Sequence, residues 1–239
     1  MSILKITNLV KTYANGQTGI KNFNIDIAPG DIYALVGHNG AGKTTIIKAI
    51  AGIHDFDTGE IMINGVSIRK DPLKCKSMIA YLPDDPELYE YLTGIQFLNF
   101  IADVYGISKS LRQKEINNLS KILGMTTHMG SIISSYSHGM KQKLSIIAAL
   151  IHSPKLLIMD EPFVGLDPTA AFNLKKIIAK YVKAGNSVFF SSHILEVVEK
   201  ICNKITIIKS GKVVVSGRIK NVVGKKGLES IYVKLSKDE

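Results

Sequence analysis

The sequence predicts an α/β fold in which a mainly parallel sheet is interrupted by an inserted helical segment. Three observations carry this prediction. Strand patterns dominate before residue 65, helical spacing dominates from about 93 to 152, and short apolar runs alternate with helical runs after 153. Strands that alternate with helices form parallel sheets joined by crossover helices. The 239 residues, of which 46% are apolar, suffice for one well-packed domain.

The first part of the chain is rich in β-branched residues and turn pairs. Asn15-Gly16 and Pro29-Gly30 separate short runs, and Asn64-Gly65 closes the last of them. A helix is expected over 43–51. The strands are expected at 2–9, 24–27, 32–36 and around Ile61 and Ile63.

The middle of the chain shows helical periodicity and almost no strand signal. Helices are expected at 94–105, 108–123 and 139–151. One face of the second helix is predicted to be buried. Its residues are Leu111, Ile116, Leu119, Ile122 and Leu123.

Strands return after this insertion. The four apolar residues 156–159 are typical of a strand buried on both faces. The elements expected beyond it are helices at 169–184 and 194–201, strands at 188–190 and 205–208, and helices packed on the end over 219–235.

Composition excludes several classes of protein. Cys75 and Cys202 lie 127 positions apart with no Cys/His cluster, which excludes a disulfide scaffold and a thiolate zinc site. No run approaches the ~18 apolar residues that span a bilayer, and the N-terminus does not resemble a secretory signal. We therefore expect a cytoplasmic chain.

The net charge of +10 is uneven along the chain. From Ile201 onward nine basic residues face three acidic ones, a net of 9 − 3 = +6. A basic surface is compatible with nucleic acid, anionic lipid, an acidic partner or phosphate ligands, and equally with ordinary solvated lysines.

A glycine-rich loop follows the strand expected at 32–36. Residues 37–44, GHNGAGKT, fit the pattern G-x-x-x-x-G-K-[ST] and lead into a helix. The glycines let backbone N–H groups surround an anion, and the helix N-terminus adds its dipole. In such a loop Lys43 reaches the β- and γ-phosphates and the Thr44 hydroxyl ligates Mg²⁺. The residues expected to contact the nucleotide are Gly37, His38, Asn39, Gly40, Ala41, Gly42, Lys43, Thr44 and Thr45.

Two carboxylates and a histidine follow later strands. Asp160 and Glu161 end the run 156–159, and Ser192-His193 follows the strand expected at 188–190. Open α/β folds bind ligands beyond the carboxyl ends of their strands. We expect Asp160 to hold Mg²⁺ and Glu161 to polarise the water that attacks the γ-phosphate. His193 should touch the γ-phosphate or that water.

ATP is favoured over GTP as the nucleotide. A GTPase needs an Asn-Lys-x-Asp base reader, and Asn203-Lys204-Ile205-Thr206 lacks the aspartate. The pair Asp160-Glu161 favours hydrolysis of ATP by in-line attack of water.

Over nearly its whole length the chain resembles ABC-type ATPases, the nucleotide-binding subunits of ABC transporters. The family's motifs occur in order, and the resemblance implies a P-loop NTPase core. They are the adenine-stacking aromatic Tyr13, the phosphate loop 37–44, the signature 136–142 (YSHGMKQ), the Walker B segment 156–161 with Glu161, the D-loop 165–167 with Asp167, and the switch residue His193.

The resemblance also implies partners. Two such chains, identical in a homodimer or different in a heterodimer, form a head-to-tail dimer with ATP held between the phosphate loop of one and Ser137, Gly139 and Met140 of the other. Ser137 suits the start of a helix because its hydroxyl can cap the first turn. A separate membrane permease is implied as well, and the aromatic segment at Leu88, Tyr89 and Tyr91 is a candidate docking surface for it.

The chain departs from the family pattern at two positions. Asp84 stands where a glutamine is usual, and we expect it to face Mg²⁺, although its role in sensing the γ-phosphate is open. His138 replaces a signature glycine, so its side chain must point away from the nucleotide. Neither change touches Glu161 or His193, and we expect an active, Mg²⁺-dependent ATPase.

The segments YLPDDPELYEYLTG, YSHGMKQKL and LESIYVKLSKDE resemble the exporter-type ABC-2 or Ecs-like group, which implies a bacterial chain peripheral to the cytoplasmic face of the membrane. Residues 1–239 are expected to form one ABC ATPase domain. Its parts are a RecA-like core with an antiparallel β subdomain (1–84 and 153–218), a helical subdomain (85–152) and a C-terminal helical tail (219–239).

Two other functions remain open from sequence. One is a soluble ABC ATPase acting on nucleic acid or ribosomes, which the basic charge allows but the single cassette and short insertion disfavour, so we expect no nucleic acid partner. The other is a non-transport regulator that uses the same dimer switch.

Overall fold

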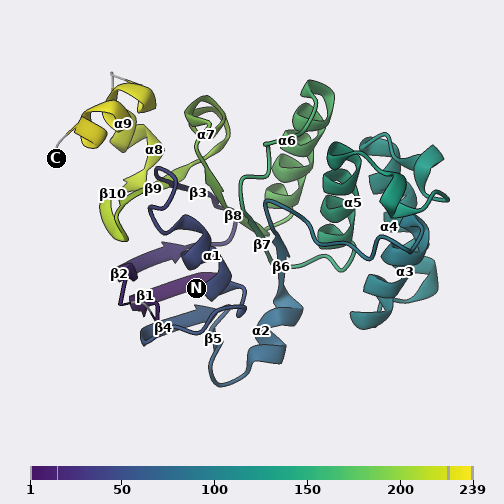
Figure 1. The fold of residues 1–239 in the computed structure, drawn as a ribbon, viewed down its shortest axis with the longest axis horizontal. Helices are drawn as coiled ribbons and strands as arrows, with labels where there is room; N and C mark the ends of the chain where they lie inside the picture. Colours follow the sequence, from purple (N-terminus) through teal and green to yellow (C-terminus); the bar gives the residue numbers. More distant parts are fainter. Residues whose placement is uncertain (1, 15, 225–226, 238–239) are drawn as a thin grey trace.

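The computed structural model describes residues 2–14, 16–224 and 227–237, which form two sheets and the helices around them (Figure 1). The strands are β1 (Leu4–Thr12), β2 (Thr18–Ile27), β3 (Ile32–Val36), β4 (Thr58–Ile63), β5 (Val66–Ser67), β6 (Ile79–Leu82), β7 (Leu156–Met159), β8 (Ser187–Ser192), β9 (Lys204–Lys209) and β10 (Lys212–Arg218). The helices are α1 (Lys43–Ile50), α2 (Pro72–Met78), α3 (Gly94–Val104), α4 (Lys109–Ile122), α5 (His138–Leu150), α6 (Pro168–Lys183), α7 (Leu195–Ile201), α8 (Ile219–Val223) and α9 (Leu228–Lys237), with 3-10 turns at Thr126–His128 and Ile133–Ser135.

The larger sheet has the order β10-β9-β3-β8-β7-β6 among the described residues. All neighbouring pairs are parallel except β10 with β9, which confirms the mainly parallel sheet. In the register, Val36 of β3 lies beside Ser192 of β8, and Phe190 of β8 lies beside Met159 of β7. The segments that follow β3, β7 and β8 therefore emerge side by side at one edge.

The smaller sheet has the order β2-β1-β4-β5 and is antiparallel, as expected for the N-terminal part. It packs with α1 on one face of the larger sheet. Successive strand residues point to opposite faces. Tyr33 and Leu35 of β3 therefore pack in the core that includes α1 and the smaller sheet, while Ala34 and Val36 pack in a second core on the opposite face of the larger sheet. One helix is thus held between two sheets.

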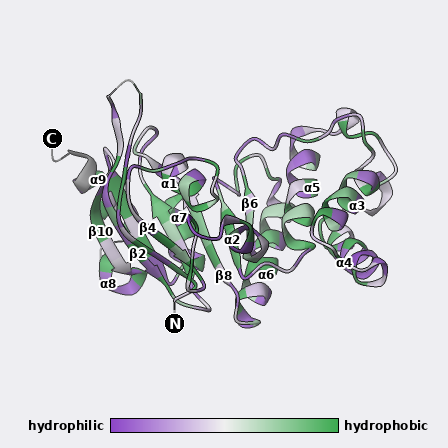
Figure 2. Ribbon diagram, turned by 90° about the horizontal axis from the view of Figure 1, so that it is seen from below, coloured by the Kyte–Doolittle hydropathy of each residue, from purple (hydrophilic) through white to green (hydrophobic). Residues whose placement is uncertain are grey.

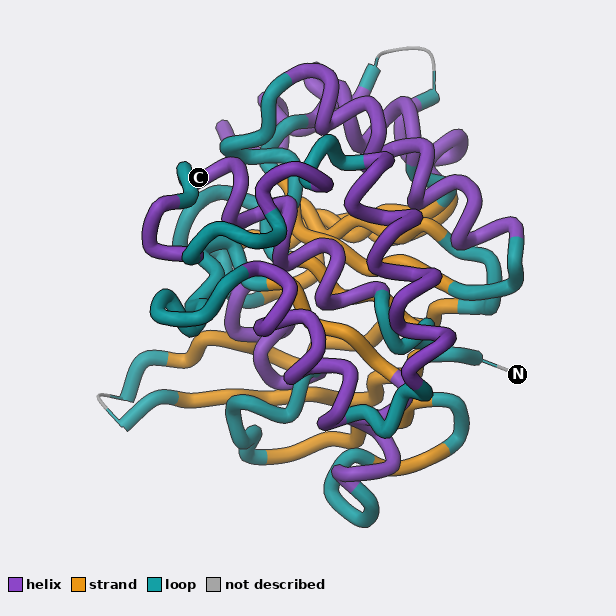
Figure 3. Tube along the Cα trace, turned by 90° about the vertical axis from the view of Figure 1, so that its right-hand side faces the viewer, coloured by secondary structure: helices purple, strands orange, loops and turns teal. Residues whose placement is uncertain are grey.

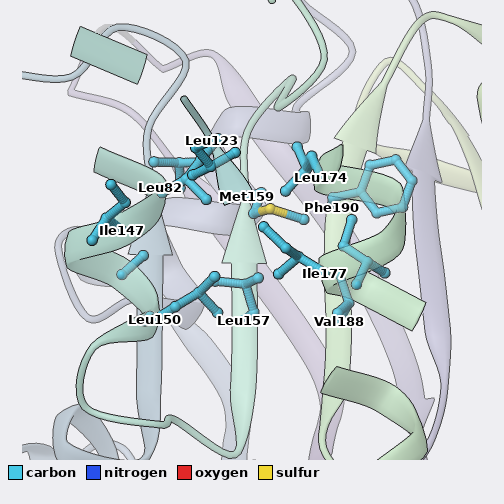
Figure 4. Packing of buried hydrophobic residues seen from close by; sticks show 14 of the residues in the cluster. Leu82, Leu123, Ile147, Leu150, Leu157, Met159, Leu174, Ile177, Val188 and Phe190 are labelled. Carbon is cyan, nitrogen blue, oxygen red and sulfur yellow. The ribbon is translucent and has the colours of Figure 1, made fainter. Parts of the chain in front are cut away.

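The second core fills the opposite face of the larger sheet. Figure 4 shows Leu157 and Met159 of β7, with Phe190 of β8, facing side chains from α5 and α6. All four residues of β7 are buried, which confirms the expectation of a strand covered on both faces. In Figure 2 the hydrophobic colour concentrates on the strands, whereas the outer helix α4 is largely hydrophilic.

Helices α3, α4 and α5 form the expected helical insertion, in front of the strands in Figure 3. Thr93 starts α3 with a reciprocal capping box to Gln96. The prediction for Leu111 is wrong, because its side chain is 48% exposed. It lies about 140° around α4 from the buried Ile116, so the buried stripe leaves it facing solvent.

Sequence patterns missed several short elements. β2 begins at Thr18 rather than near residue 24, and β5, α2 and β10 were not expected. β10 pairs with β9 through a turn at Ser210-Gly211, where both residues have positive φ. α2 starts at a Pro after Asp71, whose side chain accepts a hydrogen bond from the Lys74 N–H.

The C-terminal part is helical where it is described. α8 packs on β10 and α9 on α7, as expected for helices on the end of the fold. The basic Lys225 and Lys226 and the acidic Asp238 and Glu239 of the tail lie outside the described residues. No helix in the described ranges is long and apolar enough to cross a membrane.

Candidate nucleotide-binding site

A cavity of about 570 Å³ opens at the carboxyl edge of the larger sheet, a size typical of small-molecule sites. Many of the residues expected to bind nucleotide and metal line it. They are Tyr13, His38, Asn39, Gly40, Gly42, Lys43, Thr44, Thr45, Asp84, Asp160 and Glu161. Further lining residues were not foreseen. They are Gln17, Thr18, Gly19 and Lys21 of the β1–β2 hairpin, and Ser210 and Gly211 of the turn before β10.

The phosphate loop wraps the start of α1 as its glycine pattern predicts. Gly42 caps the helix with φ 106°, a conformation that favours glycine, and its own carbonyl accepts the Ile46 N–H. Lys43 is 7% exposed, and its Nζ donates to the Gly37 carbonyl oxygen at 2.8 Å. Its ammonium group is therefore held inside the loop, next to the helix N-terminus that favours anions.

The two carboxylates after β7 are buried beside this lysine. Glu161 Oε1 lies 3.5 Å from Lys43 Nζ, and Asp160 is only 3% exposed. The Glu161 N–H donates to Ser191 Oγ at 2.9 Å, and the same hydroxyl donates to Asp160 Oδ1. Ser191 was not expected in the site. Its position at the end of β8, two residues before His193, is a signal that could have identified it.

His193 does not line the cavity but contacts Glu161. Its Nδ1 lies 3.0 Å from Glu161 Oε2, and its backbone N–H donates to the same oxygen at 3.2 Å. Because an ionised carboxylate only accepts hydrogen bonds, Nδ1 carries the proton in this pair. One carboxylate thus meets a lysine on one oxygen and a histidine on the other.

Asp84 lies on the loop after β6 and lines the same cavity. Burial raises the pKa of its carboxyl, and repulsion from Asp160, Glu161 and Asp85 raises it further. The nearby Tyr81 has its pKa raised to about 12, chiefly by burial. The carboxylates of Asp84, Asp160 and Glu161 are therefore close enough to repel one another.

Tyr13 also lines the cavity. Its hydroxyl lies 2.6 Å from Thr45 Oγ1, and its side chain is partly exposed. The ring borders Gly19, where an added Cβ would lie 2.8 Å from Tyr13 Cε2. An aromatic face is therefore available beside the phosphate loop.

The expected signature residues do not line this cavity. Ser137 caps α5 by accepting the Met140 N–H at 3.3 Å, as its position at the helix start predicts. The His138 ring lies against Gly165, where an added Cβ would be 2.8 Å from its Cδ2. Gly139 approaches the same loop, since a Cβ there would lie 3.3 Å from the Gly165 carbonyl oxygen.

The expected D-loop residue, Asp167, also lies outside the cavity. It caps α6 by accepting the Ala170 N–H at 2.8 Å, and Lys143 of α5 donates to its other oxygen at 2.8 Å. These bonds, led by the one from Lys143, lower the pKa of Asp167. The D-loop is thereby tied to the signature helix.

The residues present fit a nucleoside triphosphate with Mg²⁺. The loop places a buried ammonium and a helix N-terminus where phosphates carry negative charge. Hydroxyl and carboxylate oxygens of Thr44, Asp84 and Asp160 line the same cavity, and oxygen is the ligand that Mg²⁺ prefers. A phosphate loop at this edge of a mainly parallel sheet defines a P-loop nucleoside triphosphatase.

Comparison with known proteins identifies the family within the P-loop nucleoside triphosphatases. The family model described as "ABC transporter" matches residues 20–164. The Bacillus subtilis protein named "ABC-type transporter ATP-binding protein EcsA" is 35% identical over 100% of this chain and 98% of its own length. The Bacillus subtilis "Linearmycin resistance ATP-binding protein LnrL" is 33% identical over 96% of this chain and 73% of its own length.

A solved structure titled "Structure of ATP binding subunit of ABC transporter" superposes with a TM-score of 0.94 and 32% identity, covering 99% of this chain and 100% of the other. The chain belongs to the ABC transporter ATP-binding family, and it is an ABC-type ATP hydrolase.

Proposed function

We propose that this chain is the ATP-hydrolysing subunit that energises a separate membrane permease, in the direction of export. The observation that carries the proposal is the junction at Glu161, where the phosphate-loop lysine and the residue after β8 meet one buried carboxylate. Such a junction lets the state of the nucleotide change the contacts of three separate segments. The name of the relative EcsA, an ABC-type transporter ATP-binding protein, supports the same function.

The chemistry proposed is in-line attack of water on the γ-phosphate of ATP, giving ADP and inorganic phosphate. Glu161 orients and polarises the water, and His193 holds Glu161 through Nδ1 while contacting the γ-phosphate or the water. Lys43 leaves its contact with Glu161 to bind the β- and γ-phosphates. Thr44, Asp160 and Asp84 would hold Mg²⁺, which would offset phosphate charge there.

The remaining nucleotide contacts are proposed to come from the backbone and from Tyr13. The loop residues 37–42 and Thr45 surround the phosphates with N–H groups, and the Tyr13 ring stacks on adenine. The partly exposed Tyr13 ring beside Thr45 supports this assignment.

A second copy of the chain is proposed to complete the site. Ser137, Gly139 and Met140 stand at the start of the 13-residue helix α5 but outside their own chain's cavity. In a head-to-tail dimer they would meet the γ-phosphate bound by the partner, with Asp167 at the same interface. ATP then holds the two copies together, and its hydrolysis releases them.

The permease is proposed to dock on the helical subdomain, 85–152, at the cytoplasmic face of a bacterial membrane. Tyr89 and Tyr91 support this placement, because their side chains are 47% and 77% exposed. We propose that the remaining parts of the chain are a core formed by 1–84 and 153–218 and a C-terminal tail formed by 219–239.

The decisive variants are Glu161→Gln and Lys43→Ala. Glu161→Gln should bind Mg²⁺-ATP but hydrolyse it about 10²–10⁴-fold more slowly, because the base is lost. It should also accumulate as an ATP-dependent dimer in size-exclusion chromatography. Lys43→Ala should lose ATP binding and therefore remain monomeric.

Glu60→Gln is the matched control, since Glu60 is exposed on β4, away from the cavity. Normal hydrolysis by Glu161→Gln would refute the base assignment. Retained ATP affinity in Lys43→Ala would refute the phosphate site.

A further inference from the structure

We propose that Ser191 is a positioning residue for ATP hydrolysis, and that its single hydroxyl sets both the metal-facing carboxylate of Asp160 and the backbone of Glu161. The inference rests on the proposed function, in which Asp160 helps hold Mg²⁺ and Glu161 polarises water.

The geometry around Ser191 is specific. Its Oγ accepts the Glu161 N–H at 2.9 Å and donates to Asp160 Oδ1. Ser191 is fully buried on β8, and Asp160 and Glu161 are 3% and 9% exposed. One side chain therefore connects β8 to both acidic residues that follow β7.

A hydroxyl suits this position because it donates one hydrogen bond and accepts others. By donating to Oδ1 it restrains the orientation of the Asp160 carboxylate, which would help to hold Mg²⁺. Mutation of a group that orients a metal-holding carboxylate typically lowers metal affinity or activity by about 10- to 100-fold.

The bond to Glu161 acts on a strained residue. Glu161 has φ 46°, which side-chain-bearing residues adopt only where their surroundings hold them. The Ser191 hydroxyl holds the N–H of that residue, while Lys43 and His193 hold its carboxylate. The direction in which Glu161 points therefore depends on the bond to Ser191.

The same strand offers a matched control. Ser187 is also fully buried on β8, and its hydroxyl also joins two backbone segments, donating to Ala28 O at 3.0 Å and accepting the Gly30 N–H at 3.2 Å. It lies at the opposite end of β8 from the cavity. Removing either hydroxyl leaves buried polar groups without a hydrogen-bond partner. Of the two, the Ser191 hydroxyl is the one that bonds to Asp160 and Glu161.

The test compares Ser191→Ala, Ser191→Cys, Ser191→Thr and Ser187→Ala in the full chain. A fluorescent ATP analogue reports affinity in EDTA and as a function of Mg²⁺ concentration, and steady-state kinetics give kcat and KM separately. For Ser191→Ala we expect the half-saturating Mg²⁺ concentration to rise about 10- to 100-fold and kcat to fall over the same range, with affinity in EDTA within about twofold of wild type.

Ser191→Cys keeps the size of the side chain and weakens both hydrogen bonds, so the same shift is expected in a smaller form even where alanine reduces the yield of folded protein. Ser191→Thr retains the hydroxyl and should restore the Mg²⁺ dependence. Ser187→Ala should lower Tm but leave the Mg²⁺ dependence of binding unchanged.

The proposal is overturned if folded Ser191→Ala and Ser191→Cys keep the wild-type Mg²⁺ dependence, or if Ser187→Ala shows the same shift. The wild-type chain separates this failure from that of the proposed function. If wild type itself shows no Mg²⁺-dependent binding or hydrolysis, the proposed function fails; if it does and the variants match it, only the role of Ser191 fails.

Discussion

Glu161 shows how one residue is held by the rest of the fold. Its left-handed conformation costs roughly 1–3 kcal/mol for a residue with a side chain. Partners from the phosphate loop and from the end of β8 fix it in place, since Lys43, Ser191 and His193 all contact it. The strain thus lies at the residue expected to position the attacking water.

Gly42 is the phosphate-loop position with the strictest requirement for glycine. An added Cβ would lie 2.5 Å from the Gly19 carbonyl oxygen, and φ is 106°. Gly40 also has positive φ, 80°, but an added Cβ there meets nothing within 4 Å. The two positions separate backbone strain from steric clash.

We expect Gly40→Ala to lower the free energy of unfolding by about 1–2 kcal/mol, the cost of the left-handed conformation. Gly42→Ala should cost about 3 kcal/mol or more, because β2 must also move away from the new methyl group. Urea unfolding without nucleotide measures both values. Equal losses would show that the approach of Gly19 does not constrain the loop.

At the scale of elements, His152 joins the helical subdomain to the larger sheet. It follows α5, its ring stacks on Tyr105 after α3 at 3.7 Å between centroids, and its Nε2 lies 3.0 Å from the Ile79 carbonyl oxygen of β6. A carbonyl only accepts, so Nε2 carries the proton. Nδ1 is buried and has no hydrogen-bond partner in the described ranges.

This contact predicts that stability falls in mild acid. Burial lowers the pKa of His152 below the usual histidine value of 6.5, although the bond to Ile79 opposes the shift. The unfolded chain therefore binds a proton at a higher pH than the folded chain does. The contribution of His152 to the free energy of unfolding should be fully present above about pH 6.5 and should decline as the pH falls below it.

Urea unfolding of wild type and His152→Gln between pH 7.5 and 5 measures this contribution. The variant should lose less stability over that range, because it lacks the titrating ring, although its stability at pH 7.5 is lower without the stack on Tyr105. His54→Gln, in the loop after α1, is the control. Parallel pH profiles for wild type and His152→Gln would contradict the assignment.

At the scale of the whole molecule, the larger sheet separates two cores. One holds α1 and the smaller sheet, and the other holds the helical subdomain. The nucleotide cavity lies at the edge where both cores meet the ends of the strands. A movement of the helical subdomain relative to the sheet would therefore act on the loop that carries Asp84.

The exposed aromatic residues just before α3 predict where the proposed permease would bind. Tyr91 is 77% exposed and its ring centroid lies 6.1 Å from that of Tyr89. Tyr91→Ala should weaken association with a polytopic membrane protein by about tenfold or more, because exposed aromatics are frequent hot spots of interfaces. Affinity purification in mild detergent from the native membrane, followed by mass identification, measures it.

Leu73→Ala is the control, since Leu73 is 80% exposed on α2 and outside the helical subdomain. Both variants should bind ATP and unfold as wild type does. Equal recovery of a membrane partner with Tyr91→Ala would move the docking surface elsewhere, and recovery of nucleic acid or ribosomes instead would contradict the transport function.

Sequence patterns predicted most long elements because the periodicity of a helix or strand depends on residues close together in the chain. β3 and β7 have the expected bounds, and α1, α3, α5 and α6 agree to within one residue at each end. Short elements were not predicted because they are stabilised by contacts with neighbouring elements rather than by a pattern of their own. β10 has no clear alternation and is defined by pairing with β9. Leu111 is exposed because it lies about 140° around α4 from the buried Ile116.

The sequence by itself determined the fold class, the phosphate loop and the two carboxylates after β7, since each depends on residues close together in the chain. Only the tertiary structure decided that Lys43 and His193 share the Glu161 carboxylate, that Ser191 bonds both the Asp160 carboxylate and the Glu161 backbone N–H, and that His152 contacts β6. These contacts join segments brought together by the register of parallel strands, and no local pattern records that register.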